Sequence, residues 1–82
     1  MPASGHQRIE KVIMEMLAAR GPDKSMCPYE VARALDENDW RELMDDVRHA
    51  AASLLADGKI RVTQGETEVH PLERRGPIRL RL

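Results

Sequence analysis

The sequence predicts one small α+β domain, in which three helices precede a small antiparallel β-sheet. Two observations support this: apolar residues recur at helical spacing before residue 58, and apolar and polar residues alternate after it. The chain has 82 residues, of which 41% are hydrophobic and 33% are charged. This size and composition favour a single folded domain over residues 1–82. We expect residues 1–5 to be a flexible N-terminus.

A first helix is predicted over residues 6–20. Its apolar side chains form one stripe of a 3.6-residue helix, at Ile9, Val12, Ile13, Met16 and Leu17. Ser4 and Gln7 match a capping box, in which side chains bond the free backbone N–H groups at the start of a helix. Gly21 can adopt the left-handed conformation after the helix, and Pro22 prevents its continuation.

A second helix is predicted over residues 28–35. Pro28 has the fixed φ angle that suits the first helical position, with Cys27 before it as the N-cap. Glu30 can reach back to the cap as in a capping box, although cysteine is a poor capping residue.

A third helix, the most regular of the three, is predicted over residues 40–57 after a four-residue polar turn. Asp39 and Glu42 match a second capping box. One side of the helix is apolar: Trp40, Leu43, Met44, Val47, Ala50, Ala51, Leu54 and Leu55. Because the chain has no Phe and one Trp, the core depends on aliphatic and small side chains, and we expect close helix packing.

A β-hairpin is predicted over residues 59–70. Val62 points toward the core in its first strand, whereas Arg61 and Thr63 point to solvent. Residues 77–82 alternate without error and predict a terminal strand. This strand pairs either beside the first strand of the hairpin or on the far side of the sheet.

Three helices followed by a hairpin is the element order of a winged helix-turn-helix. Five segments carry a closer resemblance: Cys27–Leu35, Trp40–Met44, Val47–Ala51, Ile60–Gln64 and Gly76–Leu80. With these segments the chain resembles a small bacterial winged-helix family of uncharacterised function, from about Ile9 onward. The resemblance implies the fold and DNA binding, and it implies no particular binding residues.

Several classes of protein are excluded or disfavoured by the sequence. The longest stretch without a charged residue, His49–Ala56, is too short to cross a bilayer, so we expect no membrane segment. One cysteine cannot close an internal disulfide, which favours the cytoplasm, and the three histidines lack metal-ligand spacing. Asp45 and Asp46 are adjacent and point about 100° apart on a helix, so the two carboxylates are poorly placed to share a substrate proton in acid–base catalysis. We expect no cofactor, no metal site and no catalytic activity.

Basic charge is concentrated near the C-terminus. Residues 1–58 carry a net charge of −4 and residues 59–82 a net charge of +3, for a total of −1. Positive charge gathered on one surface is typical of proteins that bind nucleic acid. Five arginines are therefore candidate contacts for DNA phosphates: Arg61, Arg74, Arg75, Arg79 and Arg81. Alternatively, they balance three nearby glutamates and protect a sheet edge from aggregation.

The third helix adds two candidates, Arg41 and Arg48, which lie about 20° apart on a helical wheel. They can reach DNA together, but the exposed side of this helix is otherwise acidic and opposes phosphate. Alternatively, Asp45 pairs with either arginine in a solvated network.

Two functions follow. The first is a DNA-binding winged helix with a role in transcription regulation, which binds double-stranded DNA weakly unless it acts as a homodimer or with a protein partner. The second is a protein-interaction module of the same fold, which uses the acidic third helix or an exposed Tyr29.

Overall fold

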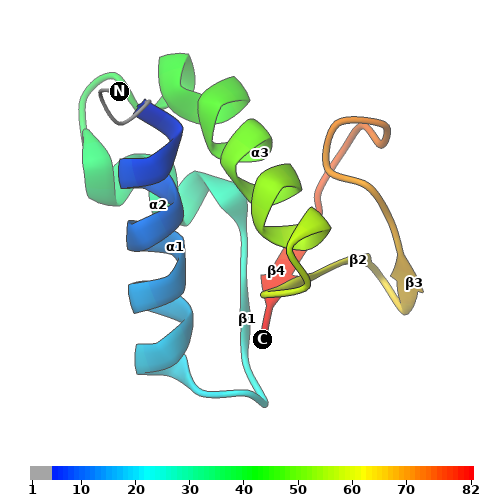
Figure 1. The fold of residues 1–82 in the computed structure, drawn as a ribbon. Helices are drawn as coiled ribbons and strands as arrows, with labels where there is room; N and C mark the ends of the chain where they lie inside the picture. The colour runs from blue at the N-terminus through cyan, green and yellow to red at the C-terminus, as the bar shows by residue number, and fades with distance from the viewer. Residues whose placement is uncertain (1–4) are drawn as a thin grey trace.

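The computed structural model describes residues 5–82 and confirms the α+β architecture (Figure 1). The elements are α1 (Gly5–Arg20), β1 (Ser25–Met26), α2 (Pro28–Leu35), α3 (Trp40–Ala56), β2 (Arg61–Gln64), β3 (Thr67–Glu68) and β4 (Arg79–Arg81). Gly5, expected in a flexible N-terminus, is instead the first residue of α1. The rest of that N-terminal segment, with the Ser4 side of the predicted capping box, lies outside the described residues.

The helices pack through small and aliphatic side chains. Ile9, Ile13 and Leu17 recur every fourth residue of α1 and are all buried. On α3, Ala50 and Ala51 are fully buried, and a methyl side chain lets neighbouring elements approach closely. The close packing expected from the composition therefore occurs at the centre of the domain.

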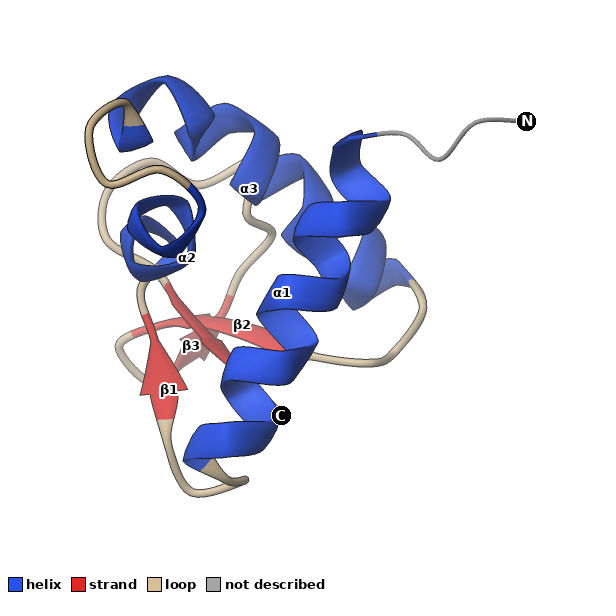
Figure 2. Cartoon of the chain, turned by 90° about the vertical axis from the view of Figure 1, so that its left-hand side faces the viewer, coloured by secondary structure: helices blue, strands red, loops and turns tan. Residues whose placement is uncertain are grey.

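The sheet is antiparallel throughout and has the strand order β1-β4-β2-β3. The terminal strand therefore pairs beside the first strand of the hairpin, and its other edge pairs with β1, which the sequence analysis did not predict. Leu80 lies opposite both Met26 and Val62, and all three side chains are buried. Figure 2 shows the sheet beneath α2, with α1 along its side.

The turn between α2 and α3 is built differently from the prediction. The Asp36 carboxylate accepts the backbone N–H groups of Asn38 and Asp39, at 3.0 and 3.1 Å. The Asp39 side chain caps no N–H group of α3, so the second predicted capping box is wrong. By contrast, Glu30 accepts the backbone N–H of Cys27 at 2.8 Å, as predicted.

The element order and the antiparallel sheet are consistent with a winged helix. We call residues 65–78, which join β2 to β4 and contain β3, the wing. Figure 1 shows its loop projecting beside α3, on the side of the molecule away from α1. The wing and α3 are therefore the elements that position most of the candidate arginines.

Candidate nucleic-acid interface

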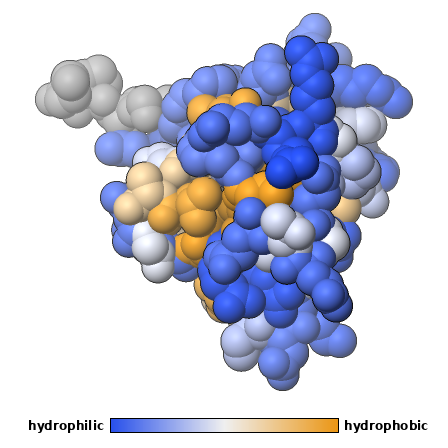
Figure 3. Space-filling model, turned by 90° about the vertical axis from the view of Figure 1, so that its right-hand side faces the viewer, coloured by the Kyte–Doolittle hydropathy of each residue, from blue (hydrophilic) through white to orange (hydrophobic). Residues whose placement is uncertain are grey.

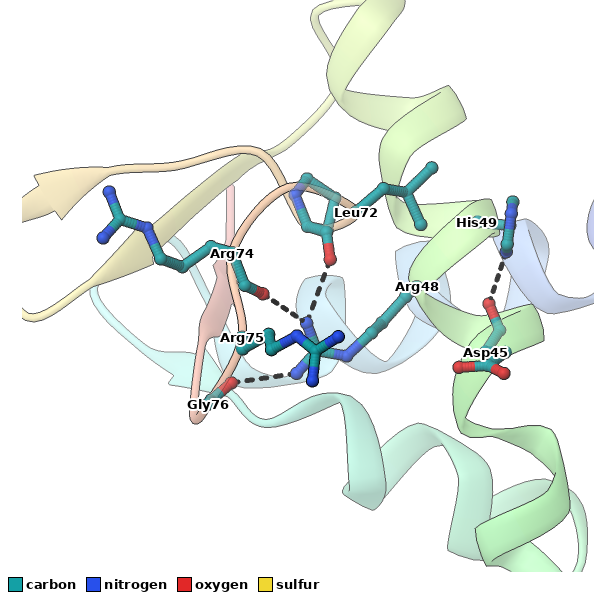
Figure 4. Close-up of a pocket in the computed structure, with 8 residues that line it drawn as sticks. Asp45, Arg48, His49, Leu72, Arg74, Arg75 and Gly76 are labelled. Atoms are coloured by element: carbon teal, nitrogen blue, oxygen red, sulfur yellow. Dashed lines mark hydrogen bonds between the residues drawn. The ribbon is translucent and has the colours of Figure 1, made fainter.

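The wing is held in place by two side chains from neighbouring elements. The Arg48 guanidinium, in the middle of α3, donates to the carbonyl oxygens of Pro71 at 2.9 Å, Arg74 at 3.1 Å and Gly76 at 2.9 Å (Figure 4). The Gln64 side-chain amide, on β2, donates to two further wing carbonyls, Arg75 at 3.0 Å and Pro77 at 3.2 Å. Five carbonyl groups thus point inward, and the wing backbone is fixed against α3 and β2.

Local geometry completes this arrangement. The backbone N–H groups of Glu73 and Arg74 both donate to the carbonyl of His70 at 3.1 Å, which forms a tight turn. Gly76 has φ +88, a left-handed conformation that glycine adopts without strain. Residues 71–76 therefore form an ordered loop, in which the side chains of Leu72, Glu73, Arg74 and Arg75 are exposed.

A cleft of about 540 Å³ lies between α3 and the wing. It is lined by Asp45, Arg48, His49, Pro71, Leu72, Arg74, Arg75 and Gly76. The bonds of Arg48 run to carbonyl oxygens, which have no net charge, so they leave its positive charge uncompensated. Arg74 and Arg75 are exposed, and Figure 4 shows the Arg74 side chain pointing away from Arg48. The wing thus carries two exposed cations beside a third that is partly buried.

The three arginines of the sheet lie on one side of it, but they are not equally free to contact DNA. Arg61 and Arg81 are direct cross-strand neighbours, and Arg61 is exposed. Arg79 is instead engaged with β1 and the residue after it, because it donates to the Ser25 hydroxyl at 2.9 Å, the Ser25 carbonyl at 3.0 Å and the Cys27 sulfur at 2.9 Å. Arg79 is therefore a structural link between β4 and β1.

Two other polar side chains on this side of the sheet are less exposed than Arg61. Thr63, predicted to face solvent, is only 7% exposed because it lies between Arg79 of β4 and Glu68 of β3 in the sheet register. Arg81 is half-buried, and its Nε lacks a hydrogen-bond partner among the described residues.

Arg41 and Arg48 are not brought together. The Arg41 guanidinium lies 4.4 Å from the centre of the Trp40 ring, a cation–π contact, while Arg48 is engaged with the wing. Trp40 is half-buried, and its ring centre is 6.0 Å from that of Tyr29, which is 41% exposed. Within residues 5–82 neither arginine forms an ion pair with Asp45, so the predicted solvated network is wrong.

Comparison with known families matches residues 6–82 to a family described as "Protein of unknown function (DUF3253)". The chain belongs to this family. This confirms the expected membership of a family of uncharacterised function. The description of the family names no activity. None of the curated proteins matches the chain. Over the described residues of this DUF3253 protein, no helix is long and apolar enough to span a membrane.

A charged cluster at the start of α2 in this DUF3253 domain is absent from the sequence-based predictions. Arg20 forms an ion pair with Glu30 and donates to the Ser25 carbonyl at 3.0 Å. Burial raises the pKa of Glu30, but the Cys27 N–H bond and the Arg20 and Arg79 charges outweigh it, so this pKa lies below its ordinary value. The cluster ties the end of α1 to β1 and α2. Only the Cys27–Glu30 spacing signalled it in the sequence.

A second missed cluster joins α1 to α3. The rings of His6 and His49 stack with centres 5.6 Å apart, and His6 Nε2 lies 3.4 Å from an Asp46 carboxylate oxygen. His49 also donates through Nδ1 to the Asp45 carbonyl at 2.8 Å. Within the part of the chain that the structure describes, no group of three or more potential ligands could hold a metal ion.

Proposed function

We propose that the chain is a non-catalytic winged helix that binds double-stranded DNA through its wing and serves transcription regulation. One observation carries this proposal. Arg48 and Gln64 draw the wing carbonyls inward, which leaves Arg74 and Arg75 exposed on a fixed backbone. Cations on a fixed loop lose little conformational freedom when they meet phosphate, so binding is less costly than for a mobile loop.

The proposal assigns a minor role to the third helix. Glu42, Asp45 and Asp46 are exposed on α3, whereas Arg48 is already bonded to the wing. Carboxylates that face phosphate oppose the release of counterions that drives nucleic-acid binding. We therefore infer that the wing contacts the phosphate backbone of DNA, with Arg61 and Arg81 of the sheet as supporting charges. We assign no contacts with base edges to α3.

The test is fluorescence anisotropy of a labelled random duplex, titrated with the protein at about 50 and 200 mM salt. The double variant Arg74→Ala, Arg75→Ala is expected to weaken binding and to reduce the salt slope by about 2, since each lost phosphate contact removes about 0.9. The matched control, Lys11→Ala with Arg33→Ala, removes two exposed cations from α1 and α2 and leaves binding nearly unchanged. No binding by the wild type at the lower salt, or equal losses in both double variants, rejects the proposal.

A protein-interaction module of the same fold is the second candidate. Figure 3 shows an apolar area within the otherwise hydrophilic face that carries the wing. Leu72, in the wing, is 46% exposed, and Tyr29 is exposed elsewhere on the domain. A continuous apolar area such as the one in Figure 3 favours contact with another protein, whereas single exposed apolar residues do not.

A further inference from the structure

A groove with an apolar floor and acidic rim lies between α1, the end of α2 and α3. It has a volume of about 310 Å³ and is lined by Arg8, Ile9, Leu35, Asp36, Leu43 and Asp46. Leu35 and Leu43 are half-buried, so part of each side chain remains open to the groove. Because one water molecule occupies about 30 Å³, the groove has room for an aliphatic side chain.

The surroundings of this groove are strongly acidic. Asp36 and Asp46 belong to the groove itself, and three more carboxylates are exposed on the adjoining turn and first turn of α3, at Glu37, Asp39 and Glu42. Two arginines, Arg8 and Arg41, oppose these five carboxylates, and His6 contacts Asp46. An occupant of this groove therefore needs an apolar side chain with positive charge beside it.

The wing of the same protein has this chemistry. Leu72 is 46% exposed at the wing, and Arg74 and Arg75 follow it within three residues. Glu73 is the one carboxylate between Leu72 and Arg75, so this stretch carries a net charge of +1. Arg48 and Gln64 hold this loop in one shape, so the leucine and arginines are presented together.

We propose that the groove of one copy of the chain receives the wing of a second copy, with Leu72 as the inserted side chain. The two wing arginines then approach the carboxylates of the groove. Because a wing and a groove are different surfaces, the contact is head-to-tail, and the pair keeps one free wing on one copy and one free groove on the other. A contact of one loop in one groove is small, so the association is weak and increases with concentration and at low salt.

The first measurement is the weight-average mass by sedimentation, at chain concentrations up to about 0.5 mM, where contacts with a Kd near 1 mM are partly occupied. At about 50 mM salt the mass is expected to rise above the 9.3 kDa of one chain, and to fall back toward it at about 500 mM salt. A mass that stays at 9.3 kDa at every concentration at the lower salt overturns the proposal.

The second measurement mixes two variants that each lose one surface. Leu72→Asp blocks the wing and Asp46→Lys blocks the groove, and both positions are exposed, so the fold is retained. Each variant alone is expected to remain near 9.3 kDa. Their mixture is expected to reach up to twice that mass and no more, because the intact wing of the Asp46→Lys variant binds the intact groove of the Leu72→Asp variant and no further contact is possible. Circular dichroism of each variant checks that it is folded.

Two matched controls accompany this experiment. Ala18→Glu adds a negative charge at an exposed position of α1 about 13 Å along the helix from the groove, and Asp23→Lys reverses an exposed charge in the turn after α1. Both are expected to associate as the wild type does. A mixture of the blocked variants that stays monomeric, or blocked variants that associate as well as the controls, overturns the proposal. The proposal does not depend on DNA binding, and the two can fail separately.

Discussion

Replacing Arg48 by Met should loosen the wing without removing apolar bulk from α3. The side chain makes one part-buried and two exposed hydrogen bonds to the wing. We assign about 1.5 kcal/mol to the first and about 0.5 kcal/mol to each of the others, which gives a loss of about 2.5 kcal/mol. With a urea m-value of about 1 kcal/mol/M for a small domain, the unfolding midpoint falls by about 2.5 M.

Hydrogen exchange locates the effect. The amides of Glu73 and Arg74, which close the turn at His70, are expected to exchange up to about 70-fold faster in Arg48→Met, since about 1.4 kcal/mol is one factor of ten. Arg48→Lys keeps the charge but cannot reach three carbonyls with one ammonium, so it recovers about one bond. Arg33→Met, at an exposed site of α2, is the control. An Arg48→Met protein as stable as that control, with unchanged wing exchange, would refute the assignment of Arg48 to the wing.

Two further predictions concern stability. Glu30→Gln should lower the free energy of unfolding by about 1 kcal/mol at neutral pH, because it removes the charge that bonds the N-terminus of α2 and pairs with Arg20. The pKa of Glu30 is lower in the folded than in the unfolded state, so its contribution to the free energy of unfolding is complete above the unfolded pKa and is lost as pH falls through the folded pKa. The stabilities of the wild type and the variant should therefore converge in acid. A stability difference that is constant with pH contradicts this. Gly76→Ala should lower Tm by about 4–8 °C, since it forces a left-handed φ of +88 on alanine at a cost of about 1 kcal/mol. Steric overlap adds nothing to this cost, because the new Cβ meets nothing closer than the Gln64 amide at 3.5 Å. A calorimetric scan with an unchanged or higher Tm counts against that strain.

The helices and the terminal strand were predictable because their apolar periodicity is strong and their ends carry local signals. The strand β1 was not, since two residues are too few to show alternation, and Ser25–Met26 becomes a strand only by pairing with β4. The candidate arginines show the same limit. A helical wheel places Arg48 beside the apolar stripe, but its partners are carbonyls 23 to 28 residues away, in a loop whose shape no local pattern specifies.

The same long-range dependence explains Arg79. The alternation of the terminal strand places Arg79 on the side of the sheet away from the core, as the structure does. It does not predict the neighbouring strand, whose Ser25 accepts hydrogen bonds from Arg79 together with Cys27, the residue that follows this strand. Burial of Thr63 follows from the same crowding. Sequence patterns thus predict which side a residue faces, whereas the partners it finds there depend on tertiary pairing.

The five carbonyl bonds of the wing also restrict how its length can vary. Surface loops ordinarily accept inserted or deleted residues, because few of their backbone groups have fixed partners. Here Arg48 and Gln64 bind carbonyls of five residues between Pro71 and Pro77, so a change of one residue in this interval would shift several acceptors away from their donors. Foreign segments are better inserted at the exposed turn between β2 and β3, around Gly65 and Glu66, which lies outside that interval.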